Sequence, residues 1–153
     1  MSLFPFAKKK EFFSPSEKEQ IVASIRQAEL QTSGEIRVYT ESRCRFVDPL
    51  ERAAEVFLSL KMDATKDHNG VLVYVAMKDK QFAVLADAGI HQKVGQAFWN
   101  QEVEMMKTHF ASQQPAKAIT AVVADIGLAL KTHFPYDSAT DKNELPDDIV
   151  FGK

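Results

Sequence analysis

The sequence predicts an α/β fold, a three-layer α/β/α sandwich with a small mixed β-sheet covered by helices on both faces. Three observations lead to this prediction. Residues 71–76 and 82–86 are almost wholly apolar runs joined by a short polar segment, which is typical of a buried β-hairpin. Residues 35–42 alternate as a strand does, and four amphipathic helical patterns surround the strands. Four such helices need a sheet to cover, and covering both of its faces gives three layers.

The first helix is expected to open on a complete start signal. Ser14, Pro15 and Glu17 provide an N-cap, a first-turn proline and a capping-box glutamate. Phe13 precedes them and is available as a hydrophobic staple. Gly34 ends the region, and the alternating strand follows it.

A second helix is expected after Asp48-Pro49-Leu50-Glu51, which repeats the same opening device. Because this helix separates the strand at 35–42 from the strand at 71–76, the two strands are predicted to run parallel through a right-handed crossover. The strand at 82–86 then folds back antiparallel, so the sheet is mixed.

Two further helices are expected in the second half of the chain. Residues 91–111 read as a single third helix, and Gln113-Gln114-Pro115 breaks it. The last helix runs from about residue 116 to residue 133 and stops before Pro135.

The chain is predicted to form one domain at residues 14–135, with an N-terminal extension at 1–13 and an acidic, largely extended C-terminal tail at 136–153. The apolar triplet at 149–151 either docks on the sandwich or on a partner, or stays in solvent with the charged tail.

Composition excludes several function classes. The 153 residues carry 19 basic and 21 acidic side chains, so the net charge of -2 gives no general attraction to nucleic acid or to anionic membranes. A single cysteine, Cys44, excludes an intrachain disulfide and a multi-thiolate metal site. No apolar stretch is long enough for a signal peptide or a spanning helix, so we expect a cytoplasmic protein without membrane insertion.

The outer ends of the predicted hairpin are the leading candidate site. Adjacent strands lie about 5 Å apart, so the segment before the second strand and the segment after the third strand should meet. Asp67, Asn69 and Asp87 would supply two carboxylates and an amide there, the oxygen ligands that calcium or magnesium prefers. The alternative is that Asp67-His68-Asn69-Gly70 is only a turn.

Two histidines and a glycine at the same edge could take part in proton transfer, metal binding or anion binding. His91 could serve as a general acid and His68 as a metal ligand or base. Gly89 lets the backbone enter a helix sharply, which leaves free amides near Ile90 that attract anions such as phosphate. The alternative is that Gly89 only turns the chain and Asp87 caps the helix.

A rival acidic site lies at the opposite edge. Glu41 ends the first strand and Asp48 caps the second helix. Ligands in open α/β sheets usually bind beyond the carboxyl ends of parallel strands, which favours this pair. Because capping already explains Asp48, the hairpin edge is preferred.

The motif order resembles the TPM-domain family, which includes a thylakoid acid phosphatase-like domain. The resemblance rests on the capped first helix, Ser33-Gly34-Glu35-Ile36-Arg37-Val38, Asn69-Gly70, Lys78-Asp79-Lys80 and Asp87-Ala88-Gly89-Ile90. The ending at 143–149 is similar to that of short, soluble bacterial members. The resemblance implies an α/β/α sandwich, divalent-cation binding at acidic loops and, in some members, phosphomonoester hydrolysis. The alternative function is a non-catalytic protein-interaction module that assists protein assembly or repair.

Overall fold

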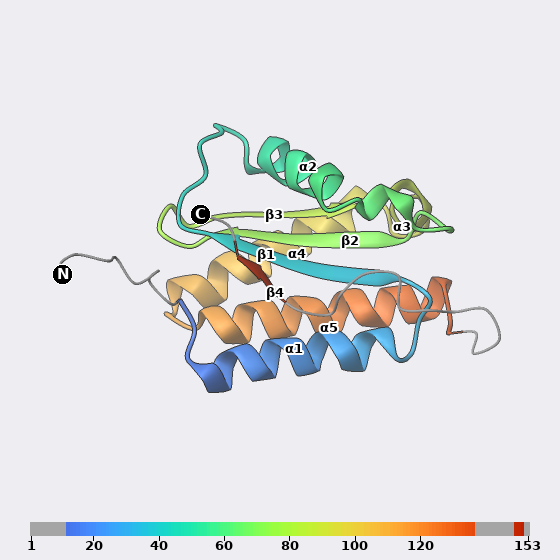
Figure 1. Ribbon diagram of the computed structural model, residues 1–153, viewed down its shortest axis with the longest axis horizontal. Coiled ribbons are helices and arrows are strands. Elements are labelled where there is room, and N and C mark those ends of the chain that lie inside the picture. Colours follow the sequence, from blue (N-terminus) through green and yellow to red (C-terminus); the bar gives the residue numbers. More distant parts are fainter. Residues whose placement is uncertain (1–11, 137–148, 152–153) are drawn as a thin grey trace.

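The computed structural model describes residues 12–136 and 149–151. Figure 1 shows how their elements are arranged. The elements, in chain order, are α1 (Pro15–Glu29), β1 (Glu35–Glu41), α2 (Pro49–Ser59), the short 3₁₀ helix η1 (Met62–Ala64), β2 (Gly70–Ala76), β3 (Gln81–Ala86), α3 (Ala88–Val94), α4 (Gln96–Ala111), α5 (Pro115–His133) and β4 (Ile149–Phe151).

The sheet is mixed, as predicted. Its strand order is β3-β2-β1-β4. β1 runs parallel to β2, and β3 pairs antiparallel with β2 as the returning arm of the hairpin. β2 is buried along its whole length, which explains why its sequence is continuously apolar rather than alternating.

Helices cover both faces of the sheet and confirm the three-layer sandwich. In Figure 1, α2 lies on one side of the sheet and α1 and α5 lie on the other. Trp99, Met106 and Phe110 of α4 belong to the same core cluster as the buried residues of α1 and α5. A smaller core lies beneath α2, where Val56 and Phe57 are buried.

The predicted helix start signals form as expected. The Ser14 hydroxyl accepts a hydrogen bond from the backbone N–H of Glu17 at 3.1 Å, and the Glu17 carboxylate accepts one from the N–H of Ser14 at 2.8 Å. At α2, Asp48 Oδ1 accepts a hydrogen bond from the N–H of Leu50 at 2.9 Å. Each contact satisfies a donor that has no partner inside its helix.

The structure differs from the prediction of one helix at 91–111. The chain forms two helices, α3 and α4, which meet at Gly95. Gly95 has φ 80°, a conformation that interrupts a right-handed helix and that glycine adopts at little cost. α3 also begins before residue 91, because Asp87 provides its N-cap.

The C-terminal triplet docks on the sandwich. β4 pairs parallel with β1, opposite Val38, Tyr39 and Thr40, and Ile149 is buried. The expected extended tail falls on residues 137–148, which lie outside the described residues, as do residues 1–11 and 152–153. Among the helices of the described part, none has both the length and the apolar character needed to cross a bilayer.

Candidate functional site

The outer ends of the β2–β3 hairpin meet, as the sequence predicts. Val71 pairs with Ala86, and the N–H of Asp87 donates a hydrogen bond to the carbonyl oxygen of Gly70 at 2.9 Å. The loop that precedes β2 and the start of α3 are therefore neighbours at one edge of the sheet.

Gly89 allows these two segments to touch. A Cβ atom placed on Gly89 would lie 2.1 Å from the backbone oxygen of Asp67 and 2.6 Å from that of His68. No side chain fits at such distances, so only glycine lets α3 pack against the 67–68 backbone. Close approach, rather than a left-handed turn, is what requires glycine at this position.

Asp87 holds two contacts at this edge. Its Oδ1 accepts a hydrogen bond from the N–H of Ala88 at 2.8 Å, as the N-cap of α3. Its Oδ2 lies 3.2 Å from Nδ1 of His68, whose backbone is left-handed with φ 49°. The two residues that the sequence separates by the whole hairpin are thus in direct contact.

Asp67 and Asn69 differ in their exposure to solvent and in their contacts. Asp67 is exposed, whereas Asn69 is buried. The Asn69 amide nitrogen donates a hydrogen bond to Oγ of Ser33 at 3.2 Å, and its backbone N–H donates one to Oγ1 of Thr65 at 3.3 Å. Among residues 12–136 and 149–151, no group of three or more His, Cys, Asp or Glu side chains is arranged to hold a metal ion.

His91 lies half-buried on α3 and contacts Trp99. The Trp99 indole N–H donates a hydrogen bond to His91 Nδ1 at 3.1 Å. In the neutral ring, the proton is then carried by Nε2. The side chain of Ile90 is buried in the core, so only its backbone remains available to a ligand.

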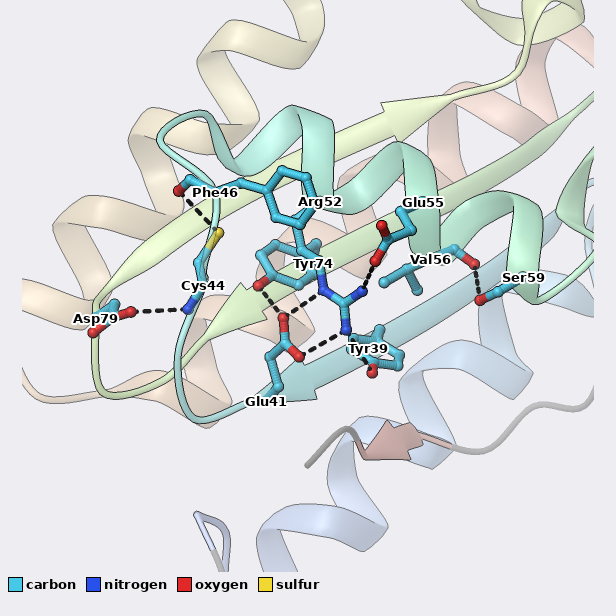
Figure 2. Close-up of polar contacts among 10 residues, drawn as sticks. All are labelled: Tyr39, Glu41, Cys44, Phe46, Arg52, Glu55, Val56, Ser59, Tyr74 and Asp79. Carbon is cyan, nitrogen blue, oxygen red and sulfur yellow. Dashed lines mark hydrogen bonds and ion pairs between the residues drawn. The ribbon is translucent and has the colours of Figure 1, made fainter.

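The rival residue Glu41 is fully engaged by other side chains, as Figure 2 shows. Arg52 of α2 donates to both of its carboxylate oxygens, from Nε and Nη2, at 2.9 Å each. The Tyr74 hydroxyl donates a further hydrogen bond to Oε2. Arg52 Nη2 also lies 3.3 Å from the Tyr39 hydroxyl, and its guanidinium lies 5.7 Å from the centroid of the Tyr39 ring. We call Tyr39, Glu41, Arg52 and Tyr74 the Glu41 cluster.

Electrostatics in the Glu41 cluster favour one protonation state. The hydrogen bond to Glu41 raises the pKa of Arg52. Burial, followed by the hydrogen bond to Glu41, raises the pKa of Tyr74, and burial also raises the pKa of Tyr39. The guanidinium therefore stays charged and the phenols stay neutral, an arrangement that ties α2 to β1 and β2.

Asp48 does not join Glu41 in a shared site. Its carboxylate caps α2, and the loop before it is tied elsewhere, because the N–H of Cys44 donates to Asp79 at 2.8 Å (Figure 2). Arg52 and both tyrosines were not predicted from the sequence as partners of Glu41. Tyr39 and Glu41 are two residues apart on one face of a strand, which was the available signal.

A buried carboxyl group between α4 and α5 was also missed. Glu102 is 5% exposed, and its carboxyl group faces Asp125 of α5. Burial, together with the charge of Asp125 and a hydrogen bond to it, raises the pKa of Glu102 to about 8. Glu102 is therefore mostly protonated at neutral pH.

Stability is expected to depend on the Glu102 proton. Because the pKa is higher in the folded state than in the unfolded chain, the stabilisation is complete below the unfolded value and is lost as pH rises through about 8. We expect the free energy of unfolding to fall by on the order of 2 to 4 kcal/mol between pH 5 and pH 8 from this group. Urea unfolding at both pH values measures the fall, and Glu102→Gln should remove most of it.

The matched control is Glu104→Gln on the same helix. Glu104 is exposed and pairs with Lys107 at 3.1 Å, so its substitution should leave the pH dependence nearly unchanged. A Glu102→Gln protein that retained the full wild-type fall would contradict the assignment.

Comparisons with known proteins agree with this architecture. The sequence model of the TPM domain matches residues 7–129. The structure is similar to the NMR structure of the BA42 protein from the psychrophilic bacterium Bizionia argentinensis, with a TM-score of 0.85, 39% sequence identity and coverage of 96% of this chain and 100% of that chain.

A more distant similarity supports the fold alone. The N-terminal domain of the cg2496 protein from Corynebacterium glutamicum has a TM-score of 0.62 and 15% identity, covering 78% of this chain and 74% of that chain. No curated protein sequence matched the chain. The match over residues 7–129 and the likeness to BA42 show that the chain belongs to the TPM domain family.

Proposed function

We propose that this protein binds a divalent cation, calcium or magnesium, at the outer edge of the β2–β3 hairpin. The observation that carries the proposal is the meeting of the 67–69 loop with Asp87. The backbone oxygens of Asp67 and His68 crowd Gly89, and Asp87 Oδ2 is within 3.2 Å of His68. The Asp87 carboxylate and the backbone oxygens of Asp67 and His68 therefore lie near one another where the sheet ends, and oxygen is the donor that these cations prefer.

The donor set fits a hard cation in its chemistry. Asp87 Oδ1 is committed to the N-cap of α3, so Oδ2 is the atom that would bind the ion, after exchanging its contact with His68. Asp67 is exposed, so its carboxylate can turn toward the same position. Asn69 is a weaker candidate ligand for the cation, because its side chain is buried and its amide nitrogen donates a hydrogen bond to Ser33.

Calorimetric titration of the protein with calcium chloride and with magnesium chloride tests the proposal. We expect Asp87→Asn to weaken binding at least tenfold, since asparagine keeps the N-cap acceptor but removes the charge. Asp67→Asn should weaken binding as well. Asp63→Asn, at an exposed aspartate of η1, is the matched control and should bind as the wild type does.

Two results would overturn the cation proposal. One is a calorimetric titration in which neither calcium nor magnesium gives a heat of binding with the wild-type protein. The other is unchanged affinity in both Asp67→Asn and Asp87→Asn, and a loss in Asp48→Asn would then move the site to the opposite edge. His68→Ala decides the role of His68: affinity falls if the ring is a ligand and does not fall if the ring only competes for Asp87.

We propose phosphomonoester hydrolysis as a second, weaker activity of the same edge. The bound cation would polarise a phosphoryl oxygen. His91 supports the proposal as a hydrogen-bond donor, because acceptance of the Trp99 hydrogen bond at Nδ1 leaves Nε2–H free to bond to a phosphate oxygen without giving up its proton. Hydrolysis of para-nitrophenyl phosphate, measured with each cation for the wild type and His91→Gln, tests it. If neither protein shows activity while the cation still binds, the non-catalytic interaction module is the better assignment.

A further inference from the structure

The free edge of β3 presents backbone groups to the outside of the sheet. Because the N–H of Asp87 bonds to Gly70, the register makes Leu85, Ala83 and Gln81 the residues that exchange hydrogen bonds with β2. Phe82, Val84 and Ala86 alternate with them. Their N–H and C=O groups therefore point away from β2.

These outward groups have no partner within the described part of the chain. None of the hydrogen bonds found there reaches the outward N–H or C=O of Phe82 or Val84. Yet Phe82 is only 6% exposed and Val84 only 5% exposed. A backbone N–H or C=O group at the edge of a sheet needs a hydrogen-bonding partner, which is either water or another chain.

The β3 strand itself lacks the sequence features that usually block strand addition. Natural edge strands are protected by lysine, proline, a bulge, an inward-pointing charge or a covering helix or loop, and here α2 and α4 flank the edge. Gln81–Ala86 contains no proline and no charged side chain, and its register with β2 is unbroken. β3 is thus chemically open to another extended chain.

A groove of about 290 Å³ lies along this open edge. Its floor is formed by residues 82–84 of β3, and its walls are Trp99 and Val103 of α4 and Pro49 and Leu50 at the start of α2. The floor spans three residues, or about 7 Å of extended chain. The groove is on the first half of β3, whereas the proposed cation edge follows its last residue.

The shape of the groove selects a narrow occupant. Residues 82–84 lie between the start of α2 and α4, which leaves room beside them for a single extended segment of about three residues. A second copy of this protein would bring its own α2 and α4 to the edge together with its β3, so we expect it to fit less well. The rim carries the carboxylates of Asp48 and Glu104 and the ammonium of Lys107, and Lys107 is already paired with Glu104 at 3.1 Å. The remaining negative charge favours a basic flank.

We propose that the open edge of β3 binds an extended peptide segment of a partner protein, with apolar residues in the groove and a lysine or arginine beside them. The peptide adds to the sheet as a strand. Its backbone hydrogen bonds go to the N–H and C=O groups of Phe82 and Val84, and its apolar side chains contact Trp99 and Val103. This site is independent of the cation proposed above.

A fluorescein-labelled peptide, Lys-Val-Ile-Val-Lys-amide, is the probe for this site. We expect saturable binding by fluorescence anisotropy. The same peptide N-methylated at its three central residues cannot donate backbone hydrogen bonds and should bind at least tenfold more weakly. Equal affinity of the two peptides would overturn strand addition, and absence of binding up to millimolar peptide would overturn the site.

Protein variants and hydrogen exchange locate the peptide. Asn100 is exposed and lines the groove, so Asn100→Trp should fill it and weaken binding at least tenfold. Gln101→Trp, at the next exposed position outside the groove, should leave affinity unchanged. Bound peptide should slow exchange of the Phe82 and Val84 amides at least tenfold, without slowing those of Ala83 and Leu85.

Two further outcomes would contradict the proposed occupant. Replacement of the flanking lysines by glutamates should weaken binding, and tighter binding would contradict the charge argument. Analytical ultracentrifugation without peptide should find no dimer whose formation protects the Phe82 and Val84 amides. Such a dimer would assign the edge to a second copy of the chain.

Discussion

Arg52→Ala is expected to lower the free energy of unfolding by about 3 to 5 kcal/mol. The substitution removes both hydrogen bonds that Arg52 donates to Glu41, whose side chain is 6% exposed, and leaves this buried carboxyl group without its cationic partner. It also removes the guanidinium from the Tyr39 ring and releases α2 from β1. Urea unfolding followed by circular dichroism at pH 7 measures the loss.

Substitutions at Glu55 and Arg52 distinguish the contribution of the ion pair between Arg52 and Glu41 from that of an exposed surface charge. Glu55 also contacts Arg52, but its side chain is 57% exposed, so Glu55→Ala should cost less than 1 kcal/mol. Arg52→Lys keeps the charge and loses the paired geometry, and an intermediate loss is expected. Equal stability of Arg52→Ala and Glu55→Ala would show that the Glu41 cluster is not a stabilising feature.

The sequence was sufficient to predict the helix starts and the β-hairpin, because the signals for these features are local. The capping motifs lie at the starts of the helices, and in the structure Ser14 and Glu17 form the complete capping box of α1, whereas Asp48 alone caps α2. The hairpin follows from two apolar runs and a short connection, and its pairing then brings Asp87 beside Gly70. That the two halves of the candidate site meet is a consequence of strand pairing.

The partners of individual side chains could not be read in the same way. Arg52 reaches Glu41 because α2 docks across the sheet with a particular rotation, which no short motif encodes. In the sequence, Glu102 cannot be distinguished from an exposed glutamate. Its burial and its contact with Asp125 depend on the packing of α5 against α4. Asn69 was expected beside the two aspartates, but the position before β2 directs it inward to Ser33.

Backbone breaks and long-range pairing set the other limits. The pattern at 91–111 is helical on both sides of Gly95, and only the positive φ at that residue divides it into α3 and α4. The triplet at 149–151 is too short to identify as a strand by itself. It becomes β4 because β1 offers a free edge at Val38, Tyr39 and Thr40.

Gly89→Ala is expected to be the most damaging small substitution at the candidate site. The added methyl group would overlap the backbone oxygens of Asp67 and His68, at 2.1 and 2.6 Å, and neither oxygen can turn aside as a side chain would. We expect a net loss of about 2 kcal/mol or more in the free energy of unfolding, because overpacking outweighs the gain of about 1 kcal/mol from replacing a helical glycine. Thermal and urea unfolding measure it.

Gly95→Ala is the matched control, because it separates steric overlap from backbone conformation. Gly95 has φ 80° and ψ 168°, and nothing lies within 4 Å of a Cβ placed there, so its substitution should cost about 1 to 3 kcal/mol through backbone strain alone. Gly89→Ala should in addition push the 67–69 loop away from α3 and weaken calcium binding in the calorimetric titration. Gly95→Ala should bind calcium as the wild type does. If both variants lost stability equally and neither changed calcium affinity, the contact between the 67–68 backbone and α3 would not be what holds the two aspartates together.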